Sequence, residues 1–124
     1  MYKIIFTTGT ILAGLGVISG AFASHALKEY LSESALSIWQ TAVKYQMYHS
    51  LALVLVAFFM TLNESISQWL NISAIAFIVG IILFSGSLYS LALSNVKILG
   101  AITPIGGLAF IIGWFSLAFY PWQQ

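Results

Sequence analysis

The chain has 124 residues, and only seven of them carry a formal charge, four lysines and three glutamates. Charged residues make up 6% of the chain, against roughly 25% in an ordinary soluble domain. Hydrophobic residues make up 60%, and the mean hydropathy is +1.00. So few charges cannot cover the surface of a soluble domain, so we expect most of the chain to lie in lipid.

The missing residue types exclude several kinds of function. Without cysteine there are no disulfides, thiolate nucleophiles or cysteine-based metal sites. Aspartate and arginine are also missing, which excludes Ser-His-Asp triads and arginine clamps on phosphate. The net charge of +1 is too small for a nucleic-acid footprint. We therefore expect a non-enzymatic protein with no cofactor, no metal ion and no nucleic-acid partner.

Four apolar stretches occupy about residues 4–23, 45–62, 70–93 and 98–120. Each is near the length of about 20 residues that crosses a bilayer as a helix, and none alternates like a membrane strand. The sequence predicts an all-α integral membrane protein, a bundle of four transmembrane helices in a single domain over residues 1–124. The first stretch also resembles a secretory signal ending at residues 21–23, but its glycines have helix-packing spacing, so we expect it to be retained.

Residues 24–44 form the longest connection and contain most of the charge: Lys28, Glu29, Glu33 and Lys44. Apolar residues at helical intervals in this connection predict an interfacial helical segment between the first two spans. Ser32 or Ser34 is expected to cap a helix that runs through Trp39 into the second span.

The lysines predict an orientation. An even number of spans places both termini on one side of the membrane. Lys28, Lys44 and Lys97 lie on the opposite side, against Lys3 on the side of the termini. Because lysine is enriched in cytoplasmic loops, both termini are expected outside the cytoplasm.

Small residues recur at helix-face spacing in three of the spans. Helices in lipid associate through close backbone approach, so these stripes predict a compact bundle. They leave open whether each stripe faces the same chain or another copy, and surplus small faces favour a homo-oligomer. The stripes are Gly9, Ala13, Gly16 and Gly20; Ala76, Gly80, Ser87, Ser90 and Ser94; and Gly106, Ala109, Gly113 and Ser116.

A second group of small and polar residues is a candidate helix-break or packing site: Ser85, Ser87, Thr103, Pro104 and Gly107. Proline fits the first turn of a helix, and threonine can cap it. One alternative is that the fourth helix begins at Thr103-Pro104, after an irregular segment or a kinked extra turn over residues 100–103. The other is one continuous helix kinked at the proline. A serine in such a helix usually bonds to backbone, and no activated base is available for a nucleophile.

The richest candidate polar cluster is His25, Tyr45, Gln46 and His49. The last three can share one helix face, and both histidines are expected at the same ends of their helices, where they can approach each other. Three roles remain open. They are a hydrogen-bond network that fixes helix register, a proton or small-solute site, and a bis-imidazole metal or haem site.

Four segments together resemble the family of small membrane proteins catalogued as domain of unknown function 423. They are residues 20–27 (GAFASHAL), 41–49 (TAVKYQMYH), 84–89 (FSGSLY) and 102–110 (ITPIGGLAF) followed by Gly113-Trp114. The resemblance implies a four-helix bacterial inner-membrane protein and brings no agreed enzymatic activity. The matching motif residues are His25, Tyr45, Gln46, His49, Ser85, Ser87, Tyr89, Thr103, Pro104 and Gly107.

Taken together, these features favour a structural or membrane-homeostasis component of a bacterial cytoplasmic membrane. Its expected partners are membrane lipids and a second copy of the chain. A small-solute or proton-linked transporter is the first alternative, and a histidine-ligated metal or haem subunit is the second.

Overall fold

The computed structural model describes residues 1–63, 65 and 67–123, and every regular element in this part of the chain is a helix. Four helical passes are long and apolar enough to cross a membrane, as predicted. In chain order the elements are α1 (Tyr2–His25), η1 (Leu27–Glu29), α2 (Glu33–Thr61), α3 (Gln68–Gly80), η2 (Ile81–Ser85), α4 (Gly86–Ser94), η3 (Lys97–Ala101), α5 (Thr103–Phe119) and η4 (Tyr120–Gln123).

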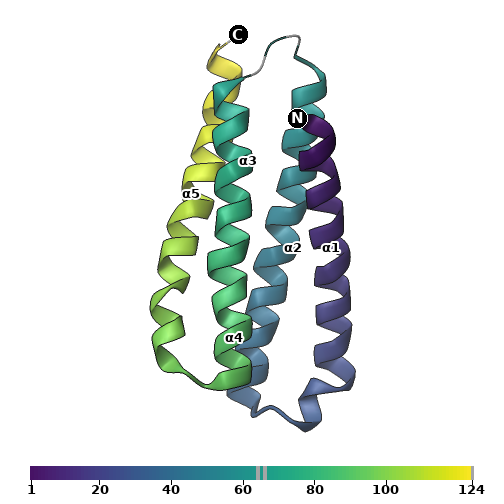
Figure 1. Ribbon diagram of the computed structural model, residues 1–124, viewed down its shortest axis with the longest axis vertical. Coiled ribbons are helices and arrows are strands. Elements are labelled where there is room, and N and C mark those ends of the chain that lie inside the picture. The colour runs from purple at the N-terminus through teal and green to yellow at the C-terminus, as the bar shows by residue number, and fades with distance from the viewer. Residues whose placement is uncertain (64, 66, 124) are drawn as a thin grey trace.

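Successive passes run in opposite directions, and both termini lie at the same end of the molecule (Figure 1). We call this the terminal end, and the opposite end, where η1 and η3 lie, the loop end. α1 packs mainly on α2, α5 packs mainly on α3 and η2, and α2 joins the two pairs through contacts with α3, η2 and α4. The outer helices α1 and α5 therefore leave much of their surface free to face lipid.

α2 begins earlier than the apolar pattern predicted, because a side chain caps it within the connection. Ser32 Oγ accepts a hydrogen bond from the Ala35 backbone nitrogen at 3.1 Å, which confirms the expected cap. Of the predicted interfacial segment, only the three residues of η1 form a separate helical turn, and residues from Glu33 onward belong to α2.

The third pass is continuous from Gln68 to Ser94 but changes its winding in the middle. η2 is a five-residue π-helix, and it changes the phase of α4 relative to α3. Phe84 in this turn lies so close to Gly106 of α5 that a Cβ on the glycine would overlap the Phe84 backbone. Only glycine allows this approach.

The fourth pass begins with the 3₁₀ turn η3, and α5 follows with Pro104 in its first turn. The helix winding therefore changes next to the proline, as in the first alternative, and the residues before it form an extra turn of 3₁₀ helix instead of an irregular segment. The expected threonine cap is wrong: Ile102 is the N-cap residue, without a side-chain hydrogen bond. Thr103 instead shares a 2.7 Å hydrogen bond with Ser87 of α4.

The glycine stripes face neighbouring helices of the same chain. On α1, Gly9 packs against Ser50 and Leu53 of α2, and Gly16 packs against Gln46 and Met47. On α5, Gly113 faces the ring of Phe77, where an added Cβ would come within 2.6 Å. Intrachain packing therefore accounts for these glycines.

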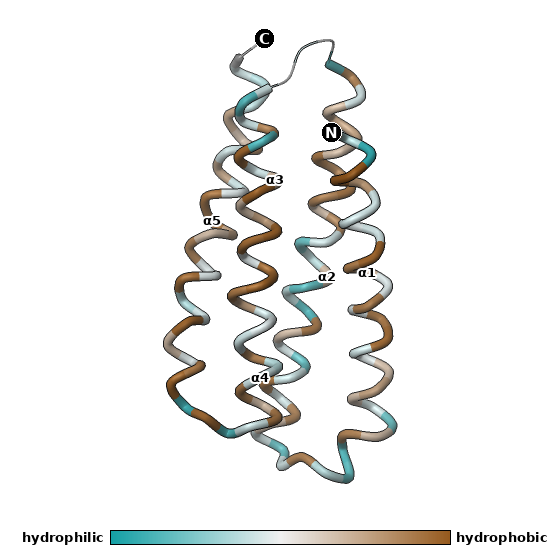
Figure 2. Tube along the Cα trace, viewed as in Figure 1, coloured by the Kyte–Doolittle hydropathy of each residue, from teal (hydrophilic) through white to brown (hydrophobic). Residues whose placement is uncertain are grey.

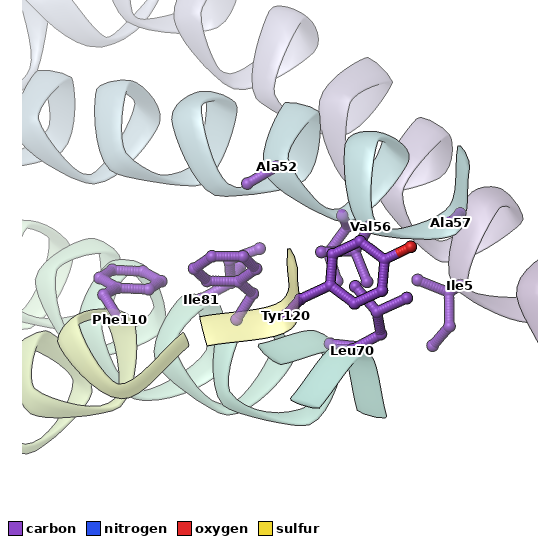
Figure 3. Close-up of a cluster of buried hydrophobic side chains, with 11 residues drawn as sticks. Ile5, Ala52, Val56, Ala57, Leu70, Ile81, Phe110 and Tyr120 are labelled. Atoms are coloured by element: carbon purple, nitrogen blue, oxygen red, sulfur yellow. The ribbon is translucent and has the colours of Figure 1, made fainter. Parts of the chain in front are cut away.

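The main apolar core lies between α2, α3 and α5 and reaches α1 through Ile5 (Figure 3). Phe77, Leu53 and Val56 are fully buried within it. At the terminal end, Asn63 Nδ2 donates a 2.6 Å hydrogen bond to the Tyr120 hydroxyl, which ties the end of α2 to the end of α5.

Candidate functional site

His49 lies two residues beyond the middle of α2, not in the first turns of a span. Its side chain is 4% exposed. Nδ1 lies 2.7 Å from the Tyr45 carbonyl oxygen, and Nε2 lies 3.1 Å from Nε1 of Trp114 on α5. A carbonyl can only accept and an indole N–H can only donate, so both bonds require the neutral ring with its proton on Nδ1. The imidazole therefore has both nitrogens occupied.

Aromatic rings enclose this imidazole. Phe110 of α5 stacks on it with ring centroids 3.5 Å apart and an interplanar angle of 7°. Trp114 meets it edge-on at 5.9 Å, and Phe77 lies at 5.5 Å. Stacking and a hydrogen bond thus hold α2 against α5 at one residue.

Gln46 joins α2 to the opposite neighbours. Its Nε2 donates to the Leu12 carbonyl oxygen of α1 at 2.8 Å, and its Oε1 accepts from the Tyr89 hydroxyl of α4 at 2.7 Å. Trp39 packs edge-on against Tyr89, with centroids 4.5 Å apart, and donates from Nε1 to the Ser19 carbonyl oxygen of α1 at 3.0 Å. This network connects α1, α2 and α4.

His25 does not join the cluster. It is exposed and is the last residue of α1. Leu12 of α1 lies level with Gln46, so His25 is 13 residues, or roughly 20 Å, further toward the loop end. The expected approach of His25 to His49 is wrong because α2 begins at Glu33 and so places His49 near the middle of its pass.

The structure also places the second candidate group. Ser85 of η2 donates to the Ala42 carbonyl oxygen of α2 at 2.8 Å, and Ser87 pairs with Thr103. Pro104 and Gly107 lie on the wall of a groove instead of joining these bonds. The serines and the threonine of this group therefore hold helices together, whereas the proline and the glycine shape the groove.

This groove lies between α2 and α5, has Phe84 of η2 on its wall, and is open to the outside of the bundle. It has a volume of about 820 Å³ and a predominantly apolar wall. Tyr48 is 54% exposed here and Tyr45 is 37% exposed. The lining residues are Tyr45, Tyr48, His49, Leu51, Phe84, Pro104, Gly107, Leu108, Phe110, Ile111 and Trp114.

Sequence reasoning missed Trp114 as the partner of His49 and Phe110 as its stacking ring. Both belong to the motif over residues 102–114. The family resemblance marked this motif, but it did not indicate that the motif contacts His49. It also missed that Tyr48 lines the groove, although Tyr48 lies three residues after Tyr45 on the same helix.

The geometry bears on the metal hypothesis. No group of three or more histidine, cysteine, aspartate or glutamate side chains gathers in the described part of the chain. Coordination by His49 Nε2 would break the hydrogen bond from Trp114, and His25 is too far away to be the second ligand. One chain therefore offers no bis-imidazole site.

Fold and site define a small four-pass α-helical membrane protein. Residues 19–107 match the model of the family described as "Protein of unknown function (DUF423)". The chain belongs to this family.

Its relatives are bacterial membrane proteins. A UPF0382 membrane protein of Staphylococcus epidermidis is 45% identical over 118 residues, which cover 93% of this chain and 92% of the relative. The UPF0382 membrane protein YwdK of Bacillus subtilis is 44% identical over 115 residues, which cover 93% of each chain. No solved structure matches the chain significantly.

Proposed function

We propose that the protein is a non-enzymatic structural or membrane-homeostasis component whose buried polar residues fix the register of its helices. The observation that carries this proposal is His49, whose two ring nitrogens are both bonded, one of them to another helix. A general base or a proton carrier needs a nitrogen that a substrate or water can reach.

The other buried polar groups support the same role. Gln46, Ser85 and Ser73 each bond to a neighbouring helix, Ser73 by donating to the Gly113 carbonyl oxygen at 2.9 Å. Such bonds between membrane helices contribute about 0.6 kcal/mol on average and up to about 1.7 kcal/mol. Together they favour one alignment of the four passes over alternatives shifted by a turn.

A paired measurement tests this function against proton-linked transport. His49→Ala removes the Trp114 bond and the Phe110 stack, so we expect its unfolding temperature in detergent to fall by several degrees. His25→Ala, an exposed control at the end of α1, should leave the unfolding temperature unchanged. Parent protein in liposomes should give no proton or ion flux between pH 5 and 8. Flux that disappears in His49→Ala, with unchanged stability, would contradict the structural role.

We further propose that the protein resides in a bacterial cytoplasmic membrane with both termini outside and associates with itself. Lys28 and Lys97 at the loop end, against Lys3 at the terminal end, support the orientation. The lipid-facing outer helices α1 and α5 offer surface for a second copy. Cysteine labelling of intact cells at residue 2 tests the orientation: protection from a membrane-impermeant reagent would contradict it. Mass determination in detergent tests self-association, and a strictly monomeric mass would contradict it.

A further inference from the structure

In the half of α2 nearer the loop end, the side that faces away from the core is polar, whereas further along the exposed residues are apolar, as at Leu51 and Leu55. Ser37, Gln40, Lys44 and Tyr48 are exposed at steps of three or four residues, so they form one ridge along the helix. Figure 2 shows hydrophilic residues along the middle of α2, whereas α3 is mainly hydrophobic there. We call these four residues the polar ridge. Polar groups that face lipid are costly and usually mark a binding surface.

Lys44 is expected to lie within the membrane. It is three residues from the midpoint of the 29-residue α2. With that midpoint set at the middle of the bilayer, the Lys44 Cα lies roughly 10 Å inside the edge of a 30 Å hydrocarbon core. No carboxylate of the described residues pairs with it. Side chains on a helix lean toward its N-terminus, so we expect the Lys44 ammonium to reach toward the headgroups at the loop end. An anion drawn in from that leaflet would neutralise the charge.

Lys44 directly precedes Tyr45, which lines the α2–α5 groove. Tyr48 lies one turn along the same ridge, and both Tyr48 and Tyr45 line the groove. Along α5 the groove runs from Pro104 to Trp114, which is roughly 15 Å. This length equals half of the hydrocarbon core, the depth of one leaflet.

Two hydroxyl groups in the groove are available. Among the described residues, none hydrogen-bonds to the hydroxyl of Tyr45 or Tyr48. An acyl chain alone cannot satisfy these donors, but phosphate and ester oxygens can. The groove therefore combines an apolar channel with two hydrogen-bond donors on its α2 wall, and one cation, Lys44, lies on the ridge next to that wall.

We propose that this groove binds an anionic phospholipid of the leaflet at the loop end. One acyl chain lies along Leu108 and Ile111, the phosphate contacts Lys44, and the tyrosine hydroxyls, which lie deeper along α2, donate to the ester oxygens. A second copy fits this surface less well, because a two-fold interface centred on the ridge would bring two Lys44 ammonium groups together.

Contact quenching tests the proposal. The protein is placed in phosphatidylcholine vesicles that contain phosphatidylglycerol, and either lipid carries brominated acyl chains that quench tryptophan on contact. The fluorescence of the Trp114→Phe variant is subtracted from that of the parent protein, and the difference is the signal of Trp114. We expect brominated phosphatidylglycerol to associate at Trp114 about fivefold more strongly than brominated phosphatidylcholine. Lys44→Gln should abolish this preference, whereas Lys28→Gln, also at the loop end but outside the groove, should keep it.

A second pair of variants closes the groove itself. A Cβ at Gly107 meets only the Phe84 ring, at 3.8 and 3.9 Å, so Gly107→Leu can fill the groove without moving the helices. We expect this variant to lose the quenching by both lipids, whereas Gly14→Leu, with open space on α1, keeps it.

Three outcomes would overturn the proposal. The first is equal quenching by the two phospholipids in the parent protein. The second is stronger quenching by a brominated free fatty acid, which would make that the occupant. The third is an unquenched Trp114 in a dimeric protein, which would show that a second copy covers the groove.

Discussion

Gln46 and Lys44 lie two residues apart near the middle of α2, but their environments are opposite. Gln46 is 5% exposed and bonds to both α1 and α4. Lys44 is exposed and has no ion pair among the described residues. In lipid a polar side chain is retained either because another helix satisfies it or because it meets something outside the chain. The two sides of α2 illustrate these two cases.

Gln46→Ala removes the polar group on the buried side of α2 and should give the largest loss of stability among these variants. It removes two interhelical hydrogen bonds and leaves a small cavity, so we expect the free energy of unfolding to fall by about 2 kcal/mol. Titration of the purified protein with a denaturing detergent measures this change. A loss below about 0.5 kcal/mol would mean that the network does not hold the helices together.

The pairing of Gln46 with Tyr89 can be separated from the effect of the cavity. In a double-mutant cycle with Tyr89→Phe, the two changes should couple by about 0.6 to 1.7 kcal/mol, because the same hydrogen bond is lost in both. Ser90→Ala provides the matched control, because Ser90 is exposed and bonds only within α4. Additive changes would place the Tyr89 hydroxyl away from Gln46.

Lys44→Gln removes the charge on the exposed side of α2 and should give the smallest change in stability. Because Lys44 makes no hydrogen bond or ion pair with the described residues, we expect the free energy of unfolding in detergent to change by less than about 0.5 kcal/mol. The same titration measures it. A large loss would show that Lys44 holds the fold together and would remove the contrast between the two sides of α2.

Much of the fold could be predicted from the sequence. Spans follow from runs of apolar residues, and the Ser32 cap follows from serine chemistry, because both depend on local composition. Glycine spacing also indicated where helices approach closely. The π-helical turn over Ile81–Ser85 could not be predicted, because it depends on a local shift in backbone hydrogen bonds that leaves the apolar pattern unchanged.

The candidate site was predicted only in part. Gln46 and His49 were identified because polar residues are rare in a membrane span. Their partners Tyr89 and Trp114 were not, because a contact between two helices depends on the rotation and register of both. His25 was wrongly joined to the cluster because the apolar run underestimates the length of α2 by 12 residues at its start.

Nitrogen NMR of the His49 ring in the bilayer-embedded protein tests the central claim most directly. Selective ¹⁵N labelling of histidine, with His25→Ala to leave one signal, reports the protonation of each ring nitrogen. The structural role predicts a proton on Nδ1 and an unprotonated Nε2 that accepts from Trp114 at neutral pH. A proton on Nε2, or a doubly protonated ring, would show that the Trp114 bond is not formed and would contradict the account.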